Sequence, residues 1–298
     1  MIRTIDPNAI SQPDLHGILL TAVAPRPICF ASTIDARGNV NLSPFSYFNV
    51  FSSNPPVLIF SPARSGRDNT LKHSHENVKE VPQVVINIVN HPMVEQMSLA
   101  STAYDKGVNE FVKSGFTQVK SEKVKPPRVG EAPVAFECSV TQVIELAETP
   151  GAGNLILAKV ELIHINEDYL TNEKLDTQKL DLIGRMGGSW YTRSSGDSLF
   201  EIPKPIRTKG IGVDALPAPI RDSEVLSGNN LGRLGNLEKF PTKAEIDEVH
   251  AMEEVTKLYK DFDGDKNERS RKVHQLAKSW LKANRTREAL ALLFKLAE

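Results

Sequence analysis

Short apolar runs separated by turn residues dominate the chain between Ile28 and Ile165. Each run has the length of a strand, and Gly, Pro, Asn or Asp residues lie between the runs. Several runs are rich in β-branched residues, which favour strands. The pattern therefore predicts a hairpin followed by further strands, the start of an antiparallel barrel or meander. The six predicted strands are Ile28–Ile34, Val40–Asn49, Val57–Ser61, Gln83–Val89, Val134–Leu146 and Asn154–Ile165.

Helical segments are predicted between these strands. Asn69 or Thr70 is a candidate N-cap for a helix over Leu71–Val81. Pro92 suits the first turn of a helix over His91–Ala100. Shorter helices are predicted at Pro13–Leu20 and at Lys106–Ser114, the latter ending at Gly115.

The composition changes after Pro205. Residues 204–242 are rich in Gly, Pro and Asn and are interpreted as an extended, irregular arm. Within this arm, the run Gly210–Pro217 is expected to pack against the barrel rather than to be disordered. We predict a first domain over residues 1–205 and an extension over residues 206–298.

The end of the chain is predicted to be mainly helical. Thr242 and Glu245 have the spacing of a capping box, which predicts the start of a helix over Ala244–Phe262. A second helical region is predicted over Asn267–Ala297, with a break near Asn284.

The second predicted strand has a polar and aromatic centre that a core strand does not need. Its residues Ser43–Asn49 could hydrogen-bond the polar side of a flat heterocycle while their aromatic rings pack nearby. An edge strand whose serines face water explains the same residues equally well.

A second polar stretch, Ser61–Lys72, combines hydroxyls, cations and the N–H groups of a predicted helix start. Such a combination is typical of a phosphate site. It is not a P-loop, because the GxxxxGK[ST] pattern is missing. A solvated basic loop with an ordinary N-cap is an equal alternative. Together, however, the two stretches suit a mononucleotide better than either does alone.

Composition narrows the class of protein. The 298 residues suffice for one large domain or two smaller ones. With 36 Lys and Arg against 37 Asp and Glu, the charge indicates neither nucleic acid nor an anionic membrane as a partner. Cys29 and Cys138 lie in apolar runs and are interpreted as reduced core thiols. We see no signal peptide and no membrane-spanning run, so we expect a soluble cytoplasmic protein.

Motifs of several enzyme classes are missing. The chain has no GxSxG, HExxH or GxGxxG sequence. His73 and His75 have no carboxylate or cysteine to complete a metal site, and we interpret His164 as a strand residue facing solvent. Asp261–Asp265 fails as a calcium loop, because Gly264 is fourth instead of sixth. We therefore expect neither a metal nor a catalytic side chain.

Residues from about 20 to 205 resemble the flavin reductase-like family of FMN-binding split barrels. The matching motifs are Pro25-Arg26-Pro27, Ser32–Gly38, Asn41–Asn49, Pro55-Pro56, Arg67–Thr70, Glu110–Gly115, Glu137-Cys138 and Gly184–Gly188. The phosphate element Arg67–Thr70 carries one inserted residue between Asp68 and Thr70 compared with the family pattern. No single motif is specific, but the combination is.

The resemblance implies a six-stranded Greek-key split barrel, usually a homodimer with FMN at the subunit interface. It implies that the flavin ring lies along Ser43, Pro44, Phe45, Ser46, Tyr47 and Asn49. It also implies that the phosphate meets Ser61, Arg67, Thr70 and Lys72. The segment Gly184–Tyr191, with Arg185, would approach the site. Its two adjacent glycines indicate a close backbone approach to a ligand or to another chain.

The activity implied by the resemblance is an NAD(P)H-dependent flavin oxidoreductase, in which NADH or NADPH passes a hydride to flavin N5. The reduced flavin could then serve oxygen, another electron acceptor or a partner oxygenase. The alternative is an FMN-binding electron carrier that oxidises no nicotinamide of its own. A pyridoxamine-phosphate-oxidase-like enzyme on the same fold is a weaker third reading, because the motifs belong to the flavin reductase branch.

Overall fold

The computed structural model describes residues 1–203, 205 and 208–296. These residues form two compact units, Met1–Phe200 and Glu201–Glu298. The predicted start of the extension at residue 206 and the predicted helix end at Ala297 lie outside the described residues.

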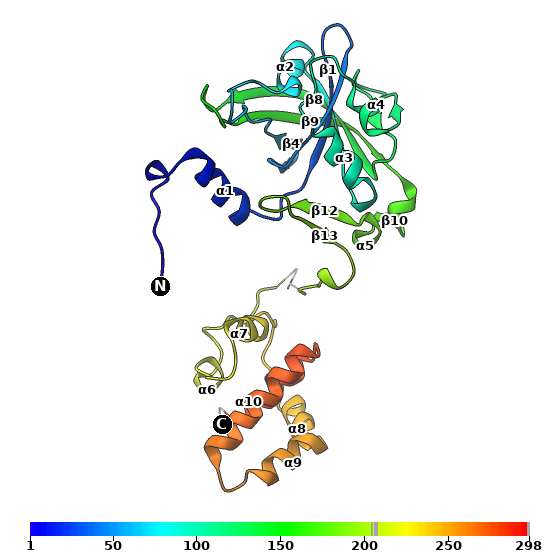
Figure 1. The fold of residues 1–298 in the computed structure, drawn as a ribbon. Coiled ribbons are helices and arrows are strands. Elements are labelled where there is room, and N and C mark those ends of the chain that lie inside the picture. Colours follow the sequence, from blue (N-terminus) through cyan, green and yellow to red (C-terminus); the bar gives the residue numbers. More distant parts are fainter. Residues whose placement is uncertain (204, 206–207, 297–298) are drawn as a thin grey trace. The chain divides into compact units, whose positions relative to one another are not determined.

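The first unit is built on a seven-stranded antiparallel sheet with the order β2-β1-β5-β8-β9-β4-β3 (Figure 1). The neighbours β1 and β5, like β4 and β9, are distant in sequence, as in Greek-key folds. The predicted mainly β fold with helical additions is confirmed. The strands are β1 (Cys29–Ile34), β2 (Val40–Phe45), β3 (Phe48–Ser53), β4 (Pro56–Phe60), β5 (Gln83–Ile88), β8 (Val134–Glu145) and β9 (Asn154–Ile165).

The two edges of this sheet are joined directly by the chain. β2 and β3 stand at opposite ends of the strand order, yet only Ser46 and Tyr47 separate them in sequence. Three residue steps of extended chain, from Phe45 to Phe48, span about 11 Å at most. The edges must therefore approach each other, so the sheet rolls into a barrel. In the described residues no ladder pairs β2 with β3, and the barrel is split at this seam.

The sheet has seven strands instead of the six predicted, because the predicted strand Val40–Asn49 is divided into β2 and the start of β3. Side chains alternate between the faces of a continuous strand, so Phe45 and Phe48, three positions apart, would face opposite sides. Both instead pack in one core cluster, where the Phe45 ring centroid lies 5.5 Å from that of Phe60. The turn at Ser46-Tyr47 allows both rings to point inward, and it interrupts the strand.

Helices cover parts of the barrel. α2 packs on β1, whereas α3 and α4 pack on β2. Two buried side-chain bonds fix α2: Asn41 Nδ2 donates to Ser74 Oγ at 2.9 Å, and Asn77 Nδ2 donates to Thr33 Oγ1 at 3.1 Å. The helices of this part are η1 (Pro7–Ala9), α1 (Gln12–Ala22), α2 (His73–Glu80), η2 (His91–Met93), α3 (Val94–Ala100) and α4 (Glu110–Ser114).

The predicted N-cap of α2 was wrong. The N-cap residue is Lys72, and no side-chain bond caps the helix. Asn69 adopts φ 60°, the left-handed conformation, which a helix N-cap does not have. The Thr70 hydroxyl is already bound to Asp68, so neither predicted residue is free to cap.

Smaller elements complete the first unit. The antiparallel hairpin of β12 (Leu182–Arg185) and β13 (Tyr191–Ser194) belongs to a separate two-stranded sheet (Figure 1). The remaining elements are β6 (Gln118–Val119), β7 (Arg128–Val129), η3 (Glu167–Tyr169), β10 (Leu170–Thr171), β11 (Lys174–Leu175), α5 (Thr177–Leu180) and η4 (Gly196–Ser198).

The second unit is helical and has its own core. Leu216 is 2% exposed in this core, so the run Gly210–Pro217 is ordered and packs among the helices of its own unit. That this run also packs against the barrel stays a prediction. The Ile211 N–H donates to Leu237 O at 2.8 Å, which ties the run to the end of α7. The helices are α6 (Ala218–Arg221), α7 (Gly228–Gly235), α8 (Lys243–Ala251), α9 (Glu253–Asp261), α10 (Lys266–Lys282) and α11 (Thr286–Phe294).

Sequence signals for these helices were largely confirmed. Thr242 and Glu245 form the predicted capping box. The break at Asn284 is present, with φ 64° at that residue. The predicted helix Ala244–Phe262 is divided at Met252, whose ψ of 140° is extended. Across the described chain, no helix has both the length and the apolar character needed to cross a bilayer.

Candidate functional site

The corner between β2 and β3 holds the residues assigned to a flavin ring. Ser43, Pro44 and Ser46 are half-buried, whereas Tyr47 and Asn49 are exposed. Phe45 is 9% exposed and its ring belongs to the barrel core, so a ligand could meet it mainly through its backbone. The corner is therefore a partly exposed polar surface on a rigid sheet edge.

Two of these side chains already have local roles. Asn49 Oδ1 accepts the backbone N–H of Val50 at 2.8 Å, which leaves its NH2 group as the donor. Burial raises the pKa of the Tyr47 phenol, although Arg26 nearby opposes the shift. The phenol is therefore protonated at neutral pH and can donate a hydrogen bond.

The corner and the predicted phosphate loop are direct neighbours. The Ser61 N–H donates to Tyr47 O at 2.9 Å. Ser61 itself is 6% exposed, and its Oγ accepts the N–H of Asn154 at 3.0 Å. The structure thus brings the two predicted surfaces together, and Ser61 is the buried residue that joins them.

Backbone bonds close the loop that follows. The Ser65 N–H donates to Thr70 O at 2.9 Å, and the Asn69 N–H donates to Ser65 O at 3.1 Å. The Thr70 hydroxyl donates to Asp68 Oδ1 at 2.8 Å. Hydrogen bonds from the Ser65 and Thr70 side chains lower the pKa of Asp68 to about 2, so this carboxylate is ionised at neutral pH. Asp68 holds the loop's hydroxyls and would not itself bind an anion.

The loop carries three cationic side chains: Arg64, Arg67 and Lys72. Arg67 and Lys72 are exposed. Arg64 is half-buried, and its Nε is buried with no hydrogen-bond partner among the described residues. A buried donor without an acceptor costs about 1–3 kcal/mol. A phosphate oxygen would supply that acceptor, so the loop fits a phosphate, and Arg64 is a candidate ligand that the resemblance did not assign.

The glycine-rich segment Gly184–Tyr191 packs closely against another segment of the same chain. A Cβ at Gly184 would lie 2.8 Å from Pro25 Cβ, and a Cβ at Gly187 would clash with Thr21 of α1. We expected the adjacent pair Gly187 and Gly188 to meet a ligand or another chain; Gly187 closely approaches Thr21 of the same chain, whereas a Cβ at Gly188 would meet no atom of the chain within 4 Å. Arg185 Nη1 donates to Trp190 O at 3.0 Å, so Arg185 also stabilises its own hairpin.

Sequence reasoning missed the part played by Arg26. Its side chain is 6% exposed although it is charged, and it bonds to three separate segments. Burial lowers the pKa of its guanidinium from the ordinary value. The available signal was the arginine between Pro25 and Pro27 just before a core strand, which we used only as a family motif.

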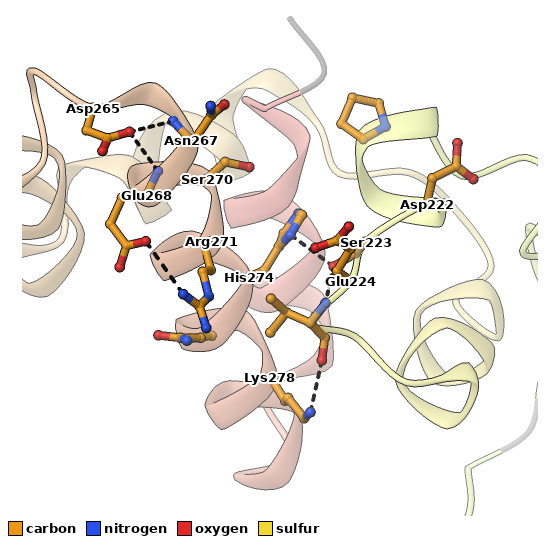
Figure 2. A pocket seen from close by; sticks show the side chains of 13 residues that line it. Asp222, Ser223, Glu224, Asp265, Asn267, Glu268, Ser270, Arg271, His274 and Lys278 are labelled. Carbon is orange, nitrogen blue, oxygen red and sulfur yellow. Dashed lines mark hydrogen bonds and ion pairs between the residues drawn. The ribbon is translucent and has the colours of Figure 1, made fainter.

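A second polar surface is a hollow of about 740 Å³ in the helical unit, between the α6–α7 connection and α10 (Figure 2). Asp265 accepts the N–H groups of Asn267 and Glu268, both at 3.0 Å, and Lys278 Nζ donates to Val225 O at 2.9 Å. Asp265 and Lys278 are thus engaged with the protein itself.

A half-buried serine and a buried histidine also line this hollow. Ser223 Oγ lies 2.9 Å from His274 Nδ1 and accepts the N–H groups of Val225 and Leu226 at 3.2 Å each. These bonds shape a turn, and among the described residues no hydrogen bond joins the imidazole to a carboxylate that could orient it as a base. In the described residues, no three His, Cys, Asp or Glu side chains are grouped to hold a metal ion.

Comparison with known proteins gives a consistent picture. Residues 22–179 match the family described as "Flavin reductase like domain". An uncharacterized protein of Aquifex aeolicus is 36% identical over 190 residues, which cover 63% of this chain and 94% of that protein. The family match ends at residue 179, before the helical unit.

Solved structures of similar fold cover about two thirds of the chain. Nitrilotriacetate monooxygenase component B from Bacillus cereus has a TM-score of 0.63 and 25% identity, covering 68% of this chain and 99% of that one. Flavoredoxin of Desulfovibrio vulgaris has a TM-score of 0.52 and 20% identity, covering 70% and 98%. The second likeness shows a shared fold only.

Proposed function

The chain belongs to the flavin reductase-like domain family, and on that premise we propose that it binds FMN and works as an NAD(P)H-dependent flavin oxidoreductase. The ring would lie along the β2–β3 corner, and the phosphate would lie in the loop from Ser61 to Lys72. The observation that carries the proposal is the 2.9 Å bond from Ser61 N to Tyr47 O, because it makes the two half-sites one surface.

The residues of the chain would bind and orient the cofactor. Arg64, Arg67 and Lys72 supply positive charge for the phosphate, with the Thr70 backbone closing the loop. The Tyr47 hydroxyl and the Asn49 NH2 group are donors that could meet polar atoms of the ring. The bound flavin supplies the redox chemistry, as the acceptor of a hydride from NADH or NADPH, so no acid or base side chain is needed.

A second copy of the chain is proposed to complete the site. β3 is an edge strand, and its Val50 and Phe51 are 63% and 64% exposed. Helix α1 is rich in leucine and isoleucine, yet every one of its residues is exposed or half-buried. Unpaired strand edges and apolar helix faces are usually covered. A homodimer with FMN at the interface would cover both.

One observation favours the alternative, an FMN-binding electron carrier. A Cβ at Gly66 would lie 3.7 Å from Gln12 Oε1, and Thr21 lies against Gly187. Helix α1 therefore runs from the phosphate loop to the glycine turn. In that position it would restrict access of a second nucleotide to the flavin.

The electron acceptor is proposed to be a partner protein, such as an oxygenase, or a small acceptor. The support is the 25% identity to a protein named as component B of a monooxygenase.

We assign flavin binding to residues 1–205, with residues 206–298 as an extension. We place the protein in the cytoplasm, where its two buried free cysteines would stay reduced.

Binding is tested first. FMN and riboflavin are titrated separately into the purified chain, with flavin fluorescence as the readout. We expect FMN to bind at least about tenfold more tightly than riboflavin, and Arg67→Gln to reduce that ratio, because the phosphate supplies the difference. Equal binding of the two flavins would reject the phosphate loop, and absence of binding would reject the function.

Turnover is tested by stopped flow. The FMN-loaded chain is mixed anaerobically with NADH or NADPH, and loss of the oxidised flavin absorbance is followed. Rapid bleaching by either nucleotide supports the oxidoreductase. Bleaching by dithionite but by neither nucleotide would support the carrier, and restored bleaching in a chain lacking residues 1–23 would identify α1 as the barrier.

A further inference from the structure

Arg26 joins three segments that are far apart in the sequence. Its Nη1 donates to the carbonyls of Val23, at 2.6 Å, and Leu20, at the end of α1. Its Nη2 donates to Met186 O, at 3.0 Å, in the turn between β12 and β13. Its Nε lies 3.4 Å from Ser46 Oγ at the β2–β3 corner.

Backbone hydrogen bonds also hold together the region where the end of α1, Arg26 and the β12–β13 turn meet, which we call the junction. The Arg26 N–H donates to Arg185 O at 3.0 Å, and the Arg185 N–H donates to Arg26 O at 2.8 Å. Gly187 packs on Thr21, so the turn and the end of α1 also touch directly. A side chain at Gly187 would separate them.

A buried guanidinium needs compensation for its lost hydration. Four oxygens are recorded as partners of Arg26, and all belong to carbonyls or a hydroxyl instead of carboxylates. Two of these carbonyls end a helix, where the helix dipole favours a cation. Apolar residues would fill this space at less cost in desolvation, but they could not hold three polar segments in one geometry.

We propose that Arg26 is a positioning residue for the flavin ring: it fixes the Ser46-Tyr47 corner relative to the Met186–Trp190 turn and the end of α1. The proposal rests on the proposed function for its flavin readouts. Arg26 acts through Ser46 and Met186 and does not itself need to touch the ring.

Three variants and a control test this role in the full-length chain. Arg26→Gln removes the three-way donor, and Arg26→Lys keeps the charge but cannot reach all three segments. Ser46→Ala removes the Arg26 contact to the corner together with a hydroxyl proposed to lie along the ring, so its effect is read beside that of Arg26→Lys. Arg37→Gln is the control, because Arg37 is exposed in the β1–β2 turn and its recorded hydrogen bond comes from its backbone. Far-UV circular dichroism confirms that each variant is folded.

Two kinds of measurement distinguish a positioning role of Arg26 from an effect on the general stability of the protein. FMN affinity and the visible circular dichroism of bound FMN report the ring environment. Hydrogen exchange of segments 19–24 and 184–191 without flavin reports the junction itself. We expect Arg26→Gln to weaken FMN at least about tenfold and to speed exchange in both segments. Arg26→Lys should be intermediate, Ser46→Ala should weaken FMN about two- to threefold, and the control should match wild type.

Each result decides the proposal. Folded Arg26→Gln protein with wild-type FMN affinity and visible circular dichroism would overturn it, as would a control that weakens FMN equally. If Arg26→Gln does not fold, wild-type affinity and spectrum in both Ser46→Ala and Arg26→Lys would overturn it. If the wild-type chain binds no FMN, the proposed function fails; unchanged exchange in Arg26→Gln would show separately that the junction does not depend on Arg26.

Discussion

Glu137 has no exposed side-chain surface, and its carboxylate is nevertheless well satisfied. It accepts the backbone N–H groups of Glu122, Lys123 and Val124 at 2.8, 2.5 and 3.2 Å, and His164 Nε2 lies 2.6 Å away. Burial alone would raise the pKa of Glu137, but these donors together lower it below its ordinary value. One buried carboxylate thus holds a whole loop on strand β8.

We expect Glu137→Gln to destabilise the barrel unit by about 2–4 kcal/mol at pH 7, because three bonds to a charged acceptor are weakened. Since the folded pKa is below the unfolded one, this stabilisation is present above the unfolded pKa and is lost as pH falls through the folded pKa. Urea unfolding should therefore show a gap between wild type and variant at pH 7 that narrows below about pH 4. A difference in stability between wild type and Glu137→Gln that does not change with pH would contradict the stabilising role of the ionised Glu137 carboxylate.

The pKa of Glu110 is shifted in the opposite direction from that of Glu137. Its Oε2 accepts the buried Leu42 N–H at 2.9 Å, and burial raises the pKa of its carboxyl above the ordinary value. A raised acid pKa means that stability falls as pH rises from the unfolded to the folded pKa. We expect Glu110→Ala to cost about 1–3 kcal/mol by orphaning Leu42 N–H. Glu110→Gln should instead reduce the fall in stability that urea unfolding shows as pH rises above the ordinary pKa of a carboxyl group, and an unchanged slope would count against this.

At the level of residues, the sequence revealed which positions are special but not what they do. Glu137-Cys138 was noticed as a family motif, yet nothing in it showed that Glu137 is buried or that His164, predicted to face solvent, is its partner. Arg26 was noticed in the same way. Buried polar contacts join residues distant in the chain, and neither periodicity nor composition reports such pairs.

Among the elements, β3 presents the clearest unpaired surface. It is an edge strand, it carries an irregularity between Val50 and Ser52, and its Val50 and Phe51 are exposed. An exposed apolar edge is a site for pairing or aggregation unless something covers it. In the proposed homodimer the second copy provides that cover.

Val50→Lys should therefore weaken the dimer at least about tenfold, because a charge would be buried at the interface. Sedimentation velocity over a range of protein concentrations measures the effect. Val112→Lys is the matched control, since Val112 is 74% exposed on α4 and should leave the dimer intact. A wild-type chain that stays monomeric at every concentration would eliminate this dimer.

Element types were predictable, and their breaks were less so. Runs such as Gln83–Val89 became strands because local pattern and burial agree. The break at Ser46-Tyr47 escaped prediction because it is set by two rings, Phe45 and Phe48, that must enter one core. That requirement concerns the closed barrel, and a local window of sequence does not contain it.

The whole molecule consists of two units with separate hydrophobic cores. We expect calorimetry to resolve two transitions. FMN at a hundred times its dissociation constant should stabilise only the barrel transition, by about 2.7 kcal/mol. Thr242→Ala, which removes the α8 N-cap, should lower only the helical transition, by about 1 kcal/mol. A single transition that responds to both changes would show that the units unfold together.

The turn between β2 and β3 also decides how far the sheet can grow. Cleavage between Ser46 and Tyr47 would leave every ladder of the main sheet in place, because in the described residues none of them joins β2 to β3. What cleavage would release is the closure: the edge strands β2 and β3 would no longer be held together, and the barrel would become an open sheet. Unpaired sheet edges can add strands from other chains. Ser46 and Tyr47, two of the residues along which the flavin ring is proposed to lie, are therefore also the residues that hold the two edges of the sheet together.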